Sequence, residues 1–277
     1  MRGLFRAALL LWLALGLAEA RGASYDDFAE GESALSRDQY DAAIKSLTAA
    51  LGAGDLKPSL VAAAYFGRSW AYYSKDDCSA GLSDENAALK IRPGYAPALT
   101  DRALLYECLQ DFPAAIADFK TLIALHPSAA LYDARGRADW LAADFSASAE
   151  DLAKATQLDG TRGYYFLWLS LAQLRLGSFD QGRLEDLTRG LNDAWPQALV
   201  RFYAGRSQER EVADAVAGGE SASRPLRQCE SDFYIGEWRL AHHDETGARE
   251  LLQRAAAGCP KGFIERMSAT VELGRPH

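Results

Sequence analysis

The residues best suited to chemistry in this chain include four histidines, two of which are adjacent. The stretch from His242 to Glu245 reads HHDE, and imidazole and carboxylate groups bind metal ions or transfer protons. A metal ion needs ligands that converge on one point, whereas neighbouring side chains in a turn between two helical segments diverge. His126 adjoins a proline that closes a helical segment, and His277 ends the sequence. We therefore expect no metal site.

Paired carboxylates are the second candidate for chemistry, because two acids can divide general acid and base work. The pairs Asp26-Asp27 and Asp76-Asp77 fall at expected helix ends or turns, where capping and solvation account for them. The sequence has no H-E-x-x-H, P-loop, G-x-S-x-G or G-x-G-x-x-G motif. We expect a protein that is not an enzyme and needs no cofactor. Besides the two binding functions given at the end of this subsection, an enzyme is a third alternative. Catalytic activity that depends on a residue of this chain would support it.

The first twenty residues have the pattern of a secretory signal peptide. Arg2 and Arg6 precede an apolar run from Ala7 to Leu17, and Ala18-Glu19-Ala20 forms an A-x-A cleavage site. We expect cleavage after Ala20 and a periplasmic protein, with an uncleaved anchor as the alternative. No cysteine stands near the cut to carry a lipid, and no later stretch is apolar and long enough to span a membrane.

The charge balance argues against nucleic acid as a partner. Removal of residues 1–20 takes away two Arg and one Glu, so the formal net charge changes from −8 to −9. Nucleic acids and anionic lipids attract basic surfaces, which an acidic protein does not offer. We therefore expect protein partners.

A helical segment recurs along the sequence. DFPAAIADFKTLIALHP, from Asp111 to Pro127, has helical apolar spacing, with Asp111 as N-cap and Pro113 in the first turn. Pro127 follows Pro93 by 34 residues, and AALKIRP closes the earlier segment as LIALHP closes the later one. Further copies occupy residues 31–51, 135–160 and 233–260.

This spacing resembles the tetratricopeptide repeat (TPR), in which small and large residues alternate at fixed positions of a helical hairpin. The matching residues are Ala103, Tyr106, Ala115, Phe119, Leu122 and Pro127 in the best copy; Ser69, Tyr72, Gly81, Glu85, Ala88 and Pro93 before it; Gly31, Ala34, Ala43, Leu47 and Ala50 in the first; and Gly236, Arg239, Ala248, Leu252, Ala255 and Pro260 in the last.

The resemblance predicts an all-α, TPR-type helical-hairpin solenoid of about four to five repeats. A single hairpin cannot bury its apolar face, so neighbouring repeats must stack. We expect repeats 1–4 over residues 24–160 and a divergent helical region over residues 161–277. That region contains a final repeat at about 229–262 and a capping helix, FIERMSATVELGR, at residues 263–275.

Four cysteines in an exported protein indicate disulfides, and four allow three pairings. No C-x-x-C spacing supports metal binding, which is the alternative. In a TPR array, Cys78 begins a second helix and Cys108 ends the next first helix, so both lie on the same side of the array. Cys229 just precedes a first helix, and Cys259 ends its partner. We predict Cys78–Cys108 and Cys229–Cys259.

The C-terminal region resembles the periplasmic NlpI-type TPR lipoproteins. The matching stretches are LWLSLAQ at residues 167–173, WP with FYAG at 195–196 and 202–205, ESDFYIG at 230–236 and FIE at 263–265. The lipid-bearing cysteine of that family is absent, which puts outer-membrane anchoring in doubt. Members look like adaptors that bind proteases and peptidoglycan hydrolases, so the resemblance implies an adaptor of the cell envelope.

In TPR arrays the first helices of the repeats line a concave face that meets ligands. Carried onto this chain, the face includes four aromatic residues and four polar ones, and these are the predicted protein-binding residues: Phe66, Trp70, Tyr73, Thr100, Glu107, Asp133, Arg137 and Trp140. Aromatic residues and arginine are common in interface hot spots. The alternative is that these rings pack against the next repeat or the C-terminal helices.

Two functions follow from these features. The first is a non-catalytic periplasmic adaptor for a protease, a cell-wall hydrolase or another envelope protein; the sequence also allows a homodimer. The second is a structural subunit of an envelope secretion or polymer-export assembly, which would migrate with a large membrane complex.

Overall fold

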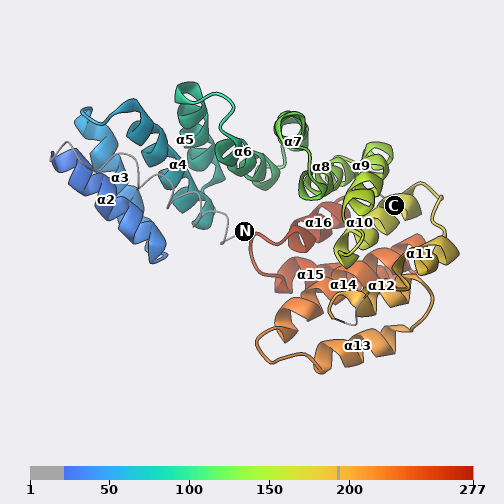
Figure 1. The fold of residues 1–277 in the computed structure, drawn as a ribbon. Helices are drawn as coiled ribbons and strands as arrows, with labels where there is room; N and C mark the ends of the chain where they lie inside the picture. The colour runs from blue at the N-terminus through green and yellow to red at the C-terminus, as the bar shows by residue number, and fades with distance from the viewer. Residues whose placement is uncertain (1–21, 192–193, 277) are drawn as a thin grey trace. The chain divides into compact units, whose positions relative to one another are not determined.

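The computed structural model describes residues 22–191 and 194–276, and within these ranges the chain is all-α. Fifteen helices, α2 to α16, occupy the described residues and are packed in consecutive pairs (Figure 1). The predicted fold class is confirmed. The predicted signal peptide, residues 1–20, lies outside the described residues.

The helices form two compact units, one ending at Leu122 and the other beginning at Ile123. The predicted division at residue 160 was based on where the repeat pattern of the sequence weakens. The boundary at residue 122 is instead based on which residues contact one another. The N-terminal unit contains α2 (Ala23–Ser36), α3 (Tyr40–Ala53), α4 (Pro58–Ser74), α5 (Cys78–Ile91), α6 (Ala96–Cys108) and most of α7 (Phe112–Leu125).

Five helical hairpins, one for each sequence copy, have the same type of turn between their two helices. The turn residues therefore align the five copies with one another. The turn residue of each has a left-handed backbone, with φ between 57° and 65°, although none is glycine: Asp38, Asp76, Gln110, Ala143 and His243. In four hairpins the next residue is an aspartate whose side chain accepts a hydrogen bond from the backbone N–H three residues on: Asp77, Asp111, Asp144 and Asp244. His243 and Asp244 are therefore a turn and a helix N-cap.

Small residues let the two helices of a hairpin approach closely. A Cβ atom on Gly31 would lie 2.6 Å from Cγ of Leu47, and one on Gly136 would lie 2.8 Å from Cγ of Leu152. Real side chains do not approach this closely, so only glycine fits at these two positions without displacing the leucine.

An ion pair ties the first helix to the second in three successive repeats. Each arginine binds both oxygens of an aspartate 16 residues later, in the pairs Arg68–Asp84, Arg102–Asp118 and Arg135–Asp151. The two distances are 2.8 and 2.7 Å in the Arg102 pair, whose guanidinium also donates to Asn86. The bidentate geometry gives these pairs more strength than a single contact. The regular Arg–Asp spacing is a further sign of the repeat in the sequence. It involves residues other than those that matched the TPR pattern in the sequence analysis.

Replacing Arg102 by leucine is expected to destabilise the N-terminal unit by about 2–3 kcal/mol, because Asp118 is 5% exposed and would keep an unpaired charge. Chemical denaturation at pH 7 measures the loss. Arg102→Lys should recover only part of it, since an ammonium group cannot bind both oxygens in the same way. A leucine variant as stable as the lysine variant would contradict this role of the ion pair.

The C-terminal unit consists of nine helices within the described residues, including two of the five hairpins: α8 (Ala129–Leu141), α9 (Phe145–Leu158), α10 (Gly163–Arg175), α11 (Gln181–Thr188), α12 (Gln197–Tyr203), α13 (Glu209–Ala217), α14 (Arg224–Ala241), α15 (Glu245–Gly258) and α16 (Ile264–Leu273). Its core is aromatic. Trp140, Trp168 and Phe233 are at most 1% exposed, and their rings lie 5.6–6.3 Å apart between centroids.

Both predicted disulfides are present. Cys78, the first residue of α5, is joined to Cys108, the last of α6, and Cys229 is joined to Cys259 at the end of α15. One placement differs from the prediction: α14 begins at Arg224, with Pro225 in its first turn, so Cys229 lies inside the helix. Proline is favoured in the first turn of a helix, and Pro225 occupies that turn of α14. The helix therefore begins in the segment before the predicted repeat.

Candidate functional site

The eight predicted protein-binding residues belong to both units. Phe66, Trp70 and Tyr73 lie on α4 and Thr100 and Glu107 on α6, all in the N-terminal unit. The other three, Asp133, Arg137 and Trp140, lie on α8 in the C-terminal unit. Each unit is therefore considered separately.

The prediction that Trp140 faces an open groove is wrong. Its side chain is fully buried, and the Arg275 guanidinium lies 4.6 Å from the centre of its ring. Trp168 from α10 and Phe233 from α14 cover other parts of the ring. The helices that follow the fourth repeat therefore fill the face that would otherwise bind a ligand.

Three further predicted residues are buried, which corrects their placement in an open groove. Phe66 is 5% exposed and packs edge-on against Tyr95, with ring centroids 5.9 Å apart. Glu107 is 7% exposed, and Asp133 is 8% exposed and pairs with Arg137 at 3.2 Å. The other four predicted residues are partly exposed: Trp70, Tyr73, Thr100 and Arg137.

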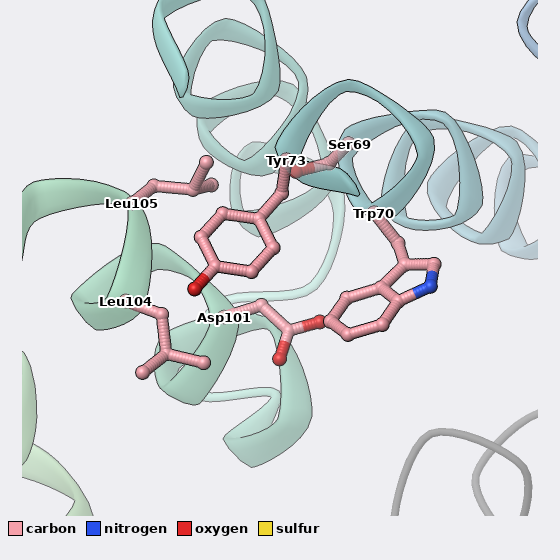
Figure 2. A pocket seen from close by; sticks show the side chains of 6 residues that line it. All are labelled: Ser69, Trp70, Tyr73, Asp101, Leu104 and Leu105. Carbon is pink, nitrogen blue, oxygen red and sulfur yellow. The ribbon is translucent and has the colours of Figure 1, made fainter. Parts of the chain in front are cut away.

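Trp70 and Tyr73 line a shallow hollow between α4 and α6, together with Ser69, Asp101, Leu104 and Leu105. The two rings lie 5.7 Å apart and are tilted by 33°. Figure 2 shows these rings, from α4, and the Asp101 carboxyl group, from α6, pointing toward one another. Asp101 was not among the predicted site residues. It lies between Thr100 and Ala103, so the repeat register places it on this helix, although that register does not indicate that it lines the hollow.

A buried glutamate, Glu85, lies behind Asp101. Glu85 on α5 is fully buried, and neither of its carboxylate oxygens has a hydrogen-bond partner among the described residues. The Ser69 hydroxyl donates to the Gly81 carbonyl oxygen at 2.9 Å, and its hydrogen bonding to the Glu85 carboxyl group partly offsets the rise in the pKa of Glu85. Glu85 occupies the repeat position that is apolar in the other copies, where it is filled by Leu47, Phe119, Leu152 and Leu252. Glu85 is thus the one charged residue at a repeat position that is apolar in the other four copies.

Burial raises the pKa of Asp101 to about 7. Burial, and after it the negative charge of Asp101, raises the pKa of Glu85 well above its ordinary value. Burial also raises the pKa of Tyr73, and the charges of Glu107, Asp101 and Asp76 add to the shift. These three shifts share their first cause, which is burial, because a poorly hydrated environment disfavours the charged form of each group.

Replacing Glu85 by leucine is expected to stabilise the N-terminal unit by about 1–3 kcal/mol at pH 8, because an unpaired buried carboxylate is removed. A carboxyl group whose pKa is higher in the folded chain than in the unfolded chain is stabilising at low pH. That contribution is lost as the pH rises from about 4.5 through the folded pKa. The gain should therefore be smaller at pH 5 than at pH 8. Thermal unfolding at both pH values measures it, and an equal or negative effect would contradict the argument.

The histidines among the described residues do not belong to any cluster of possible metal ligands there. The His242 ring stacks on Trp238, with centroids 4.2 Å apart, and its Nδ1 lies 2.7 Å from the Trp238 carbonyl oxygen. Across residues 22–191 and 194–276 there is no group of three or more His, Cys, Asp and Glu that could hold a metal ion. No helix in the described part of the chain is both long and apolar enough to cross a membrane.

Two solved structures of TPR proteins have a similar fold. One from Parabacteroides merdae superposes with a TM-score of 0.64 at 15% identity, over 91% of this chain and 99% of that chain. The C-terminal part of a TPR repeat-containing protein from Cytophaga hutchinsonii gives a TM-score of 0.50 at 14% identity, over 95% and 94%. No family model matches the sequence.

The chain therefore has the fold of a helical repeat protein. Within that class, its fold is that of TPR proteins.

Proposed function

We propose that this protein is a non-catalytic adaptor of the bacterial cell envelope that binds a protease, a cell-wall hydrolase or another envelope protein. The observation that carries the proposal is the partly exposed face of α4 and α6, where Trp70, Tyr73 and Thr100 are accessible on the stacked first helices. TPR scaffolds generally use their helical surfaces to bind proteins. Aromatic residues on such a face are suited to anchoring a partner.

Three further features support a periplasmic location. The N-terminal twenty residues have the pattern of a signal peptide. Each unit contains one disulfide that joins two of its own helices. Disulfides persist in oxidising compartments such as the periplasm. The sequence resemblance to NlpI-type lipoproteins implies the same compartment and the same kinds of partner.

The test is crosslinking capture from native envelope extract with the mature chain, residues 21–277. Wild type is compared with Trp70→Ala and Tyr73→Ala. Tyr72→Ala is the matched control, because Tyr72 lies on the same helix but near the Arg68 guanidinium, at 5.9 Å. We expect a protein that is captured by wild type and by the control, and lost by both site variants.

Two outcomes would contradict the proposal, the first its binding face and the second its adaptor role. If all four proteins capture the same partners, the face of α4 and α6 is not the binding surface. If the chain migrates only as a fixed part of a large membrane complex, it is a structural subunit. Melting temperatures of the variants, measured first, separate loss of binding from loss of folding.

A further inference from the structure

A groove of about 210 Å³ lies in the C-terminal unit, over α14 and between α13 and α15. Both of these helices pack against α14 (Figure 1). The floor of the groove is aliphatic: Ile235 of α14 is 6% exposed and Leu251 of α15 is 8% exposed, and Ala213 of α13 forms one wall. A volume of roughly 150 Å³ holds a benzene molecule, so this C-terminal groove has room for a side chain as large as leucine.

The C-terminal groove lies on the side of α14 that faces away from the aromatic core. Phe233 packs against Trp140 in that core, and Glu237 binds Arg175 there. Successive residues of a helix are about 100° apart around its axis, which places Ile235 on the opposite side of α14 from Phe233 and Glu237. The packing that covers Trp140 therefore does not fill this groove.

The length of the groove favours a polypeptide segment over a free amino acid. Its α14 side extends from Gln228 to Arg239, which is about 16 Å at the helical rise of about 1.5 Å per residue. An extended chain advances about 3.3 Å per residue, so about five residues can lie along the groove. Alternate side chains of such a chain point to the same side. When the central side chain fills the floor, the side chains two positions away therefore reach the two ends.

The charges that line the groove favour a basic residue in this segment. Arg239 binds both oxygens of Glu209, and Arg254 binds both oxygens of Asp232, so both arginines are already paired. Glu250 of α15 is exposed and forms no ion pair with any residue in the described part of the chain. Three acids and two arginines leave the lining with a net charge of −1. A lysine or arginine side chain would compensate it.

We propose that the C-terminal groove binds an extended segment of a protein partner. An aliphatic side chain of the segment packs on Ile235 and Leu251, and a basic side chain two residues away pairs with Glu250. This site goes beyond the proposed function, because it lies in the other unit from the face of α4 and α6. It gives the chain a binding surface in each unit.

The experiment is a methyl NMR titration of the mature chain, residues 21–277, with the peptide acetyl-Lys-Ala-Leu-Ala-Lys-amide. Lysine at both ends allows either chain direction. The chain has six isoleucines, and Ile235→Val assigns the δ1-methyl signal of the one that lines the groove. We expect a saturable shift of this signal and none of Ile44 or Ile91 in the N-terminal unit. Serine in place of the peptide's leucine should weaken binding about tenfold, because the aliphatic burial is lost. Glutamate in place of both lysines should weaken it several-fold.

Two variants of the chain test the groove itself. Ala213→Phe places a ring in the groove from an exposed helix position and should abolish the shift. Its control is Ala217→Phe, one helical turn further along α13 and outside the lining. Glu250→Gln should weaken binding of the lysine peptide about threefold. Its control is Glu245→Gln, because Glu245 is an exposed acid of the same helix that does not line the groove. Melting temperatures of all four variants show that they are folded.

Several results would overturn this assignment. They are equal binding of the leucine and serine peptides, equal effects of the two phenylalanine variants, and equal effects of the two glutamine variants. Tighter binding of free leucine or lysine than of the peptide would make a small molecule the ligand. A shift of the Ile235 signal that grows with protein concentration alone would make a second copy of the chain the occupant. Trp70→Ala should bind the peptide as wild type does, so the groove and the face of α4 and α6 are tested independently.

Discussion

Replacing Arg175 by methionine is expected to destabilise the C-terminal unit by about 3–5 kcal/mol at pH 8. The Arg175 guanidinium pairs with Glu237 at 2.6 Å and with Glu272 at 2.5 Å, and both glutamate side chains are at most 1% exposed. Arg275 also binds Glu272, at 2.5 Å. Removal of Arg175 therefore leaves the Glu237 carboxylate buried without its cation, which costs more than the ion pair contributed. Urea unfolding with hydrogen exchange by mass spectrometry locates the loss.

The pH dependence of this variant tests the physical cause. Burial, opposed by Arg175 and reinforced by Glu272, raises the pKa of Glu237 to about 7. Without Arg175 the pKa rises further, so Glu237 is protonated in the folded variant at pH 5.5. The destabilisation should then be smaller at pH 5.5 than at pH 8. Adding Glu237→Gln should recover part of the loss at pH 8. A loss that does not depend on pH, and that Glu237→Gln leaves unchanged, would assign the effect to packing.

Loss of the Cys78–Cys108 disulfide has the second largest expected effect. Its two cysteines are 30 residues apart, and in the chain-entropy model a loop of this length contributes about 3–4 kcal/mol. Cys78→Ala/Cys108→Ala should lower the unfolding free energy of the N-terminal unit by that amount. Guanidinium unfolding followed by hydrogen exchange measures it. The second disulfide, Cys229–Cys259, closes a loop of the same length in the other unit and is the matched control.

The control distinguishes a local effect from a general one. If Cys229→Ala/Cys259→Ala weakens protection in the C-terminal unit and leaves the N-terminal unit unchanged, each bond stabilises its own unit. An N-terminal pair variant as stable as wild type would contradict the entropic argument.

The hairpins and the disulfides could be predicted because both follow from local sequence. Pro113 in the first turn of a helix and Asp111 as its cap fix where α7 begins, and the structure places the helix at Phe112–Leu125 with Asp111 Oδ1 accepting from the Ala114 N–H at 3.2 Å. The repeat register then fixes which helix ends meet, and hence which cysteines can join. The limit of local reasoning appears at α14, where one helix begins before its predicted start.

The candidate site was only half predicted. Trp70 and Tyr73 were found from their repeat positions, whereas Asp101 and Glu85 were not. Glu85 was aligned with the large apolar position of the motif, and its charge at that position was the available signal. The sequence does not show how close two helices lie. Only the fold shows that Glu85 of α5 and Asp101 of α6 interact electrostatically in a poorly hydrated environment.

The sequence by itself determined the helical hairpins, their register and the two disulfides, because periodic burial, turn backbone and helix caps depend on residues close along the chain. Tertiary structure alone decided which first-helix positions stay accessible. Tyr73 and Trp140 share a repeat position, so the repeat pattern cannot distinguish them, since exposure depends on what later packs there. In the C-terminal unit, Trp168, Phe233 and Arg275 cover Trp140, and Arg275 lies 135 residues further along the chain.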